Sequence, residues 1–335
     1  MKTEILSTHT PALFNAAVQR ATELLRAGEV VALPTETVYG LAANALDEKA
    51  VAKIFQIKGR PAHNPIIVHV SSNAMAQACV TGWTGHAEKF SRAFWPGPLT
   101  LVLPRAEKIP DAVAAGGATV GVRWPSHPFM QAVIRACGFP LAAPSANLSN
   151  QISPTNAEHV RAQLAGKIPL IVDGGQSQVG IESTVLDLTV SPPRILRPGM
   201  IHAESLAAVG LPIADCRLPI ETGSLKSPGQ LKKHYSPKAK LVVVSWKDDA
   251  DLDAQLSTQH ASRLTCHVIA HTNIPAGFSA ANVSVIPHDA EAFARALYAE
   301  LHRCDAAGAE TIVVEAPPDL PEWSAIVDRL RRAAA

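Results

Sequence analysis

Apolar residues recur along the chain in two alternating patterns, one at helical spacing and one in short continuous runs. Helical spacing marks residues 15–28, 49–59, 74–80, 128–138 and 157–166. Strand-like runs occupy residues 29–35, 64–70, 99–105, 118–125, 169–175, 183–190 and 194–199. Strand–helix–strand units mixed with hairpin-like pairs predict an α/β fold, with a twisted mixed β-sheet flanked by helices.

The pattern breaks between about residues 212 and 239, where Pro, Gly and Ser punctuate a polar stretch without a sustained period. This composition is typical of a linker. Beyond it, strand-like runs alternate with two helical segments, at residues 291–308 and 322–334. We therefore predict a first domain over residues 1–215, a linker over 216–238 and a small C-terminal Rossmann-like α/β domain over 239–335.

Composition limits the partners of this chain. Its 30 Lys and Arg residues nearly balance 29 Asp and Glu residues, so no global field attracts nucleic acid or anionic lipid. The apolar runs are too short to span a bilayer, and the N-terminal stretch lacks the apolar segment of a secretory signal. Five widely separated cysteines form no CxxC pair, as in a cytoplasmic protein with reduced thiols. An anion site, if there is one, must be local.

Cations gather beside predicted strands. Lys58 and Arg60 alternate in a segment expected to be extended or turned, so we expect them to point the same way. Asn64 and His69 stand near the two ends of the strand that follows. A solvated pair of cations and a core histidine are the simpler interpretations, but the same residues are able to orient a ligand.

Two arginines stand at the ends of predicted apolar strands. Arg123 precedes Trp-Pro and Arg197 precedes Pro-Gly, and burying either without a partner would cost several kcal/mol. We therefore expect both to reach solvent or an anion. Together with Lys58 and Arg60, they suit a polyanion such as a triphosphate.

Hydroxyl groups recur at successive strand ends, where open α/β sheets bind ligands. Thr35, Glu36 and Thr37 follow one strand, and an equally acceptable interpretation is an N-capped turn. The other candidates are Ser145, Asn147, Ser149, Ser153, Ser183 and Thr184. Turn and cap roles are the alternative for all of them.

Standard nucleotide and hydrolase motifs are missing. No GxGxxG, GxSxG, HExxH or zinc-finger spacing occurs. Gly175 and Gly180 have the separation of a P-loop, but Ile181 and Glu182 replace its Lys and Ser/Thr. A standard P-loop is therefore excluded.

Taken in order, the motifs resemble the long form of the threonylcarbamoyl-AMP synthase family, which has a YrdC-like catalytic domain, a linker and a C-terminal domain. They are PTETVYGL, KGRPAHNP with IIVHV, WPGPLTLVL, VGVRWP, APSANLSNQISPT, DGG with ESTVLDL, ILRPG and HYSP. The resemblance is dense over residues 15–238. Ala42 stands where many members of the family have Gly.

The resemblance implies an enzyme that joins L-threonine, bicarbonate and ATP into threonylcarbamoyl-AMP and pyrophosphate, for delivery to the tRNA threonylcarbamoyl-transfer machinery. It implies Mg2+ held mainly through the phosphates, and Lys58 and Arg60 as catalytic cations. It assigns threonine to Thr37, His69, Arg123, Ala143 and Ser183. It assigns ATP to Arg60, Asn64, Thr119, Ser145, Ser153, Arg197 and Tyr235.

Two alternatives stay open on the sequence. A non-enzymatic RNA-binding module would use the same cations on a phosphate backbone, although near-neutral charge and the lack of an aromatic ladder weigh against it. A carbamoyl-transfer enzyme would need acylphosphatase-like and zinc-finger segments that the chain lacks. The resemblance also implies that the linker folds over the nucleotide as a lid, whereas its composition alone favours a passive tether.

Overall fold

The computed structural model describes residues 2–210, 212–214, 226–229, 233–258, 262–263 and 265–335. The chain forms two compact units, one comprising Met1–Ser149 with Ser153–Gln230 and the other Asn150–Ile152 with Leu231–Ala335. Of the predicted linker, residues 216–225 and 230–232 lie outside the described part.

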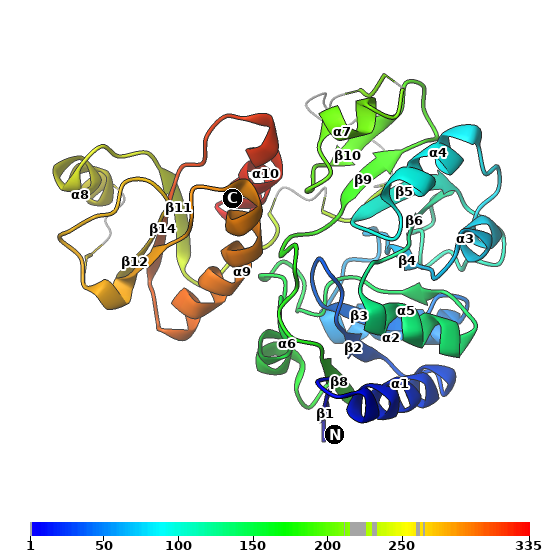
Figure 1. Cartoon of the computed structure of the whole chain (residues 1–335). Coiled ribbons are helices and arrows are strands. Elements are labelled where there is room, and N and C mark those ends of the chain that lie inside the picture. Colours follow the sequence, from blue (N-terminus) through cyan, green and yellow to red (C-terminus); the bar gives the residue numbers. More distant parts are fainter. Residues whose placement is uncertain (1, 211, 215–225, 230–232, 259–261, 264) are drawn as a thin grey trace. The chain divides into compact units, whose positions relative to one another are not determined.

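A mixed ten-stranded sheet forms the centre of the first unit (Figure 1). From edge to edge its strands are β1 (Glu4–Ser7), β8 (Leu170–Asp173), β2 (Val31–Leu33), β3 (Gly40–Asn44), β7 (Leu141–Ala142), β4 (Val68–His69), β6 (Thr119–Arg123), β5 (Leu99–Pro104), β9 (Thr184–Asp187) and β10 (Arg194–Arg197). The sheet contains both parallel pairs, such as β5–β9, and antiparallel pairs, such as β5–β6. The predicted twisted mixed sheet is confirmed.

Strand alternation separates two apolar cores. On β2, Val31 and Leu33 pack with helices α1 (Pro11–Arg26) and α5 (Pro128–Cys137), while Ala32 faces the opposite core. Successive strand residues point to opposite faces, so a strand buried on both sides is apolar throughout. The continuous apolar run in this segment follows from that double burial.

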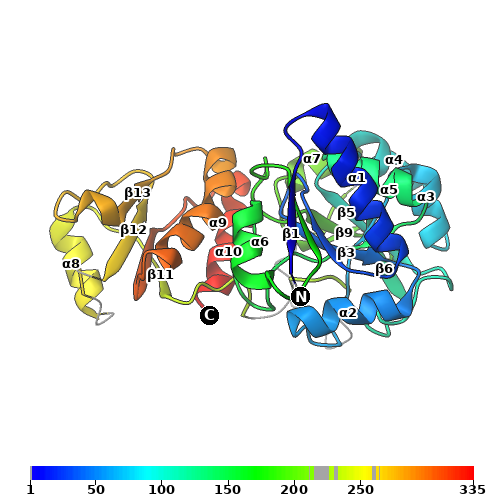
Figure 2. The same cartoon turned by 90° about the horizontal axis from the view of Figure 1, so that it is seen from below.

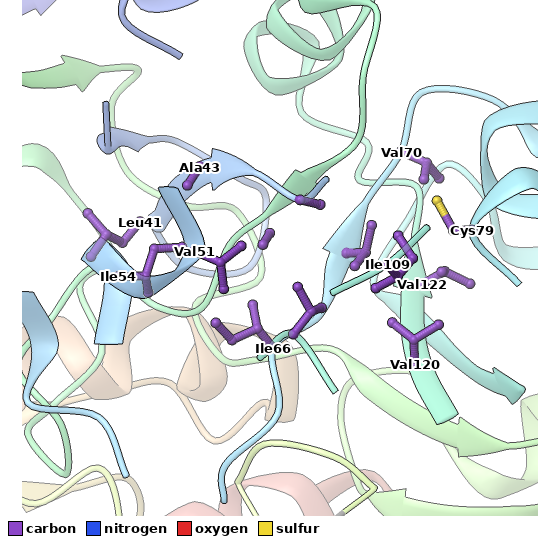
Figure 3. Close-up of a cluster of buried hydrophobic side chains, with 14 of the residues drawn as sticks. Leu41, Ala43, Val51, Ile54, Ile66, Val70, Cys79, Ile109, Val120 and Val122 are labelled. Atoms are coloured by element: carbon purple, nitrogen blue, oxygen red, sulfur yellow. The ribbon is translucent and has the colours of Figure 1, made fainter. Parts of the chain in front are cut away.

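The second core of this unit is the larger one, and Figure 3 shows part of it. Leu41 and Ala43 of β3 lie against Val51 and Ile54 of the helix α2. The helices that contribute to this core are α2 (Glu48–Lys58), α3 (Asn73–Cys79), α4 (Gly85–Phe94), α6 (Ala157–Leu164) and α7 (Ala203–Ala207). The helices therefore cover both faces of the sheet.

The second unit is built on four parallel strands in the order β11 (Lys240–Val244), β14 (Thr311–Glu315), β12 (Cys266–Ala270) and β13 (Val283–Val285). Helix α8 (Asp249–Thr258) packs Leu252 and Leu256 against Val268 and Val313 on one face. Helices α9 (Ala290–Ala306) and α10 (Ser324–Ala333) lie on the other face (Figures 1 and 2). The expected small α/β domain is confirmed.

Candidate functional site

A row of registered residues crosses three strands of the first unit. On β7, β4 and β6, Leu141 pairs with His69 and His69 pairs with Arg123. Leu141 belongs to the apolar core beneath α1 and α5, whereas its two neighbours in the row are polar. The same face of the sheet therefore changes from apolar core to polar site between β7 and β4.

Arg123, at the end of β6, is buried and already has a partner of opposite charge. Its Nη2 lies 2.7 Å from Glu36 Oε1, its Nη1 donates to Thr37 Oγ1 at 2.9 Å and its Nε donates to the Gly97 carbonyl at 3.2 Å. Arg123 thus reaches an anion, as expected, but in this structure that anion is the carboxylate of Glu36 from the same chain. The sequence does not show this partner, because it is the fold that brings Glu36, in the loop after β2, next to Arg123.

Glu36 is ionised in this environment. Burial opposes ionisation, but the Arg123 guanidinium and the Ser126 amide, which donates to Oε1 at 3.0 Å, hold the pKa of the Glu36 carboxyl below its usual value. The ion pair thus places opposite charges side by side in a buried position.

Glu36 Oε2, His69 Nδ1 and Asn64 Oδ1 are among the buried polar atoms that have no hydrogen-bond partner within the described residues, and Arg123 Nη2 has only its ion-pair contact with Glu36. Leaving such an atom unsatisfied costs about 1–3 kcal/mol, so each is a candidate to receive a ligand. Burial first, and then Arg123, lower the pKa of His69 to about 3. Its imidazole is therefore neutral at ordinary pH.

A second polar cluster lies at the ends of β5, β9 and β10. Arg197 donates through Nε to the Ser183 carbonyl at 3.0 Å and through Nη2 to Ser183 Oγ at 3.1 Å. Ser183 Oγ in turn lies 2.9 Å from Thr100 Oγ1. Arg197 is buried, and these contacts are with neutral groups of its own chain. They show neither the solvent nor the anion that the sequence led us to expect.

Gly121 connects the two clusters. A Cβ at this residue would stand 3.1 Å from Thr100 Cγ2 and 3.5 Å from the Ile67 side chain. Residues two apart on a strand share a face. Arg123 therefore lies on the same face of the sheet as Gly121, and His69 lies on the same face as Ile67. Both clusters therefore lie on one face of the sheet, spread over β4, β6, β5, β9 and β10.

Lys58 and Arg60 do not alternate in an extended segment: Lys58 lies in the helix predicted over residues 49–59, and the chain turns at Gly59 before Arg60. Lys58 is the last residue of α2, and Gly59 ends the helix in the left-handed conformation at φ 59°. Glycine adopts that conformation without strain, so a helix with this C-cap continues through the lysine.

The two cations bond to backbone carbonyls. Lys58 Nζ donates to the carbonyls of Ser145 and Asn147, both at 2.5 Å, and burial, reinforced by Arg60, holds its pKa well below the usual value. Arg60 donates through Nε to the Asn64 carbonyl at 2.9 Å and through Nη2 to the Pro65 carbonyl at 2.5 Å. Both side chains thus fix the loops that carry other candidate residues.

The remaining candidates of the first unit lie on strands or strand-end loops. Ser153 donates to Glu182 Oε1 at 2.6 Å, a buried pairing that the sequence reasoning missed. Ala143 donates its amide to the Ile67 carbonyl at 3.1 Å, beside the polar row. Thr119 begins β6 opposite Pro104.

Tyr235 belongs to the second unit. Its backbone has a φ of 63°, and its buried ring packs against Tyr298 and beneath the guanidinium of Arg329, 5.3 Å from the ring centroid. The next residue, Ser236, donates its amide to the Asn150 carbonyl at 2.8 Å. Tyr235 is thus held by the fold of its own unit.

No group of three or more His, Cys, Asp or Glu side chains gathers as a metal site within the described part of the chain. In the same part, no helix is long and apolar enough to cross a membrane. The polar groups of the site are an ion pair, hydroxyls and arginines. Fold and site together define an α/β protein with buried charged and polar groups gathered on one face of a mixed sheet.

Comparison with known proteins shows to which family the chain belongs. A family model described as telomere recombination (Sua5, YciO and YrdC) matches residues 23–199, and the threonylcarbamoyl-AMP synthase C-terminal domain matches residues 201–335. The chain is similar to the threonylcarbamoyl-AMP synthases of Bacillus subtilis, at 41% identity over 99% of this chain and 95% of that one, and of Pyrococcus abyssi, at 38% over 95% and 94%.

A crystal structure of P. abyssi Sua5 complexed with L-threonine superposes with a TM-score of 0.88, at 36% identity over 100% of this chain and 98% of that one. The chain belongs to the threonylcarbamoyl-AMP synthase family, whose members are nucleotidyltransferases of tRNA modification that use ATP. The family resemblance of the sequence is confirmed, and the alternative of a non-enzymatic RNA-binding module loses its support.

Proposed function

We propose that this chain joins L-threonine, bicarbonate and ATP into threonylcarbamoyl-AMP and pyrophosphate, and that the tRNA threonylcarbamoyl-transfer machinery consumes the adenylate in the cytoplasm. The observation that supports this most is the continuous polar face from His69 and Arg123 to Ser183 and Arg197. On this face an amino acid and a nucleotide would bind next to each other, held by residues of rigid strands. Threonine in the P. abyssi structure supports the same proposal.

In this proposal, threonine lies against the ion-pair end of the polar face. Arg123 has N–H groups beyond those that Glu36, Thr37 and Gly97 receive, and they suit the substrate carboxylate. The neutral His69 offers Nδ1, and hydroxyls are available for the threonine side chain. The proposed threonine residues are Thr37, His69, Arg123, Ala143 and Ser183.

ATP is assigned to the loops around the second cluster. Arg197 and Arg60 carry charges that complement phosphates, and Asn64 Oδ1 offers an acceptor to the nucleotide. Lys58, expected as a catalytic cation, is better assigned to positioning, because it holds the loop of Ser145 through two carbonyls. The proposed ATP residues are Arg60, Asn64, Thr119, Ser145, Ser153, Arg197 and Tyr235.

The chemistry needs no covalent enzyme intermediate. The amine of threonine loses a proton and bonds to the carbon of CO2 derived from bicarbonate, giving a carbamate. A carbamate oxygen then attacks the α-phosphorus of ATP, and the bond to pyrophosphate breaks. Holding the reactants in line lowers the barrier by roughly 7–11 kcal/mol, and fixed cations stabilise charge that develops on the leaving group.

Mg2+ is proposed to accompany ATP, bound mainly by phosphate oxygens. Among the described residues no group of three or more His, Cys, Asp or Glu side chains gathers that would cage the ion by itself, and Glu36 is paired through Oε1 with Arg123. When bound, Mg2+ would neutralise charge on the phosphates.

We further propose that residues 216–238 act as a lid over the nucleotide. Within the first unit, Lys226 Nζ lies 2.9 Å from Asp187 Oδ2 at the end of β9, and Arg197 Nη1 donates to the Pro228 carbonyl at 3.4 Å. These contacts bring the described part of the linker, residues 226–229, to a residue assigned to ATP.

Mass spectrometry tests the proposed reaction. The protein is incubated with ATP, Mg2+, bicarbonate and L-threonine, and threonylcarbamoyl-AMP is sought. We expect the adenylate only when threonine is present. RNA binding that weakens with salt, without any adenylate, would instead favour a non-enzymatic module.

A further inference from the structure

Glu36 lies in the loop between β2 and β3 and is buried although it is charged. Its Oε1 takes both contacts, from Arg123 Nη2 at 2.7 Å and from the Ser126 amide at 3.0 Å. Its Oε2 has no hydrogen-bond partner among the residues that the structure describes. Buried carboxylate oxygens are nearly always hydrogen-bonded, so this oxygen is an acceptor available to a ligand.

The charges around Glu36 select the kind of ligand. Arg123 is cationic, and His69, its registered neighbour on β4, is neutral because burial and Arg123 disfavour its charged form. The site therefore holds one negative and one positive group side by side. A zwitterion matches both charges, whereas a simple anion would be repelled by the carboxylate.

We propose that Glu36 Oε2 accepts a hydrogen bond from the α-ammonium group of the amino-acid substrate, which makes Glu36 a specificity-determining residue. This rests on the proposed function, which places L-threonine beside Thr37, His69 and Arg123. Arg123 then receives the substrate carboxylate, and the two charged ends of the zwitterion lie on the two members of the ion pair. The site thereby selects α-amino acids over α-hydroxy acids of the same shape.

A purely structural role for Glu36 predicts something different. If the carboxylate only held Arg123 and the Ser126 amide in place, its loss would disturb every ligand of Arg123 to the same extent. If it also receives the ammonium, its loss weakens ligands that carry the ammonium far more than ligands that lack it. The ratio of two affinities separates the two roles.

Titration calorimetry on the full chain measures this ratio. The ligands are L-threonine and the 2,3-dihydroxybutanoate of matching configuration, in which a hydroxyl replaces the ammonium. Glu36→Gln keeps the shape and an oxygen for Ser126 but presents an amide in place of the charge. The matched control is Glu29→Gln, which removes a half-exposed carboxylate that pairs with Lys53.

We expect the wild type and Glu29→Gln to prefer threonine by about 30-fold or more, the effect of a hydrogen bond between charged groups. Glu36→Gln should reduce this preference at least tenfold by weakening threonine alone. An unchanged ratio in Glu36→Gln, or equal weakening of both ligands, overturns the assignment.

Equal binding of both ligands by the wild type overturns it too, whether or not the variant folds. Wild-type protein that makes no threonylcarbamoyl-AMP contradicts the proposed function itself. Wild-type protein that makes the adenylate without preferring the ammonium contradicts the role of Glu36 alone.

Discussion

Lys58, a candidate site residue, is bound by carbonyl groups of its own chain. Its side chain is buried at 3% exposure, and its ammonium group joins the end of α2 to the carbonyls of Ser145 and Asn147. A neighbouring Lys and Arg in the sequence do not reveal this, because the carbonyls come from a loop more than eighty residues later. The sequence was thus able to mark Lys58 as a candidate site residue, but it gave no sign of the two carbonyls that Lys58 binds.

Lys58→Met should therefore affect both stability and ATP use. Without the ammonium, two buried carbonyls lose their donor, and we expect the unfolding free energy to fall by about 1–3 kcal/mol. The KM for ATP should rise as the loop shifts. Urea unfolding and steady-state kinetics check both, with Lys53→Met as the control on the same helix.

Lys53 is half exposed, pairs with Glu29 and donates to the Gly28 carbonyl at 2.8 Å, where water can replace it, so the loss in Lys53→Met should stay below about 1 kcal/mol. A Lys58→Met protein as stable as wild type, with an unchanged KM, would show that the two carbonyl contacts are dispensable.

His69 predicts a pH dependence. Its pKa falls from an unfolded value near 6.5 to about 3 in the fold, so the unfolded chain binds the proton first as pH drops. The stability due to neutral His69 is complete above pH 6.5 and is lost progressively between 6.5 and about 3. At pH 5 the loss amounts to about 2 kcal/mol.

Urea unfolding of wild type and His69→Asn at pH 7 and pH 5 measures this contribution. The stability difference between the two pH values should shrink in His69→Asn and stay unchanged in His86→Gln, which replaces an exposed histidine. The same pH difference in His69→Asn and wild type would contradict the assigned protonation state.

At the scale of elements, most strands were predictable, because double burial leaves long apolar runs such as β5 and β8. β3 was not among the predicted strands, since Gly40–Asn44 has no β-branched residue, yet it pairs with both β2 and β7. The strand is there because neighbouring strands complete its hydrogen bonds, and a single-segment pattern carries no information about neighbours.

Gly199 limits how β10 approaches β9. A Cβ at this residue would stand 2.3 Å from the Thr184 amide nitrogen and 2.7 Å from Thr184 Oγ1. Gly199→Ala must therefore push the two strand ends apart and disturb the Arg197–Ser183 contacts. We expect a loss of about 1–3 kcal/mol and weaker ATP binding.

Thermal unfolding and nucleotide titration test this prediction. Gly85→Ala is the control, because its Cβ would meet nothing within 4 Å and the residue begins α4. An ATP affinity of Gly199→Ala equal to that of the wild type would show that Arg197 is not part of the nucleotide site.

At the scale of the whole molecule, two separate α/β units and a linker-like composition were predictable from the break in hydrophobic pattern. The assignment of Asn150–Ile152 to the second unit was not, because three residues inside a loop carry no compositional signal. The predicted boundaries and the lid over residues 216–238 stay predictions.

Limited proteolysis tests the lid on the full chain. Cleavage within residues 216–238 should slow when ATP and threonine are both bound, because a closed linker is a poor protease substrate. Lys226→Ala removes the contact with Asp187 and should speed cleavage, whereas Lys233→Ala, which alters an exposed lysine, should not. If the cleavage rate is the same with and without ligands in every variant, the linker is a passive tether and not a lid.

The central claim is that one polar sheet face brings threonine and ATP together for reaction. Pyrophosphate release, measured with threonine, bicarbonate and ATP each omitted in turn, tests it most directly. We expect release only when all three are present. Pyrophosphate released at the same rate without threonine would contradict it.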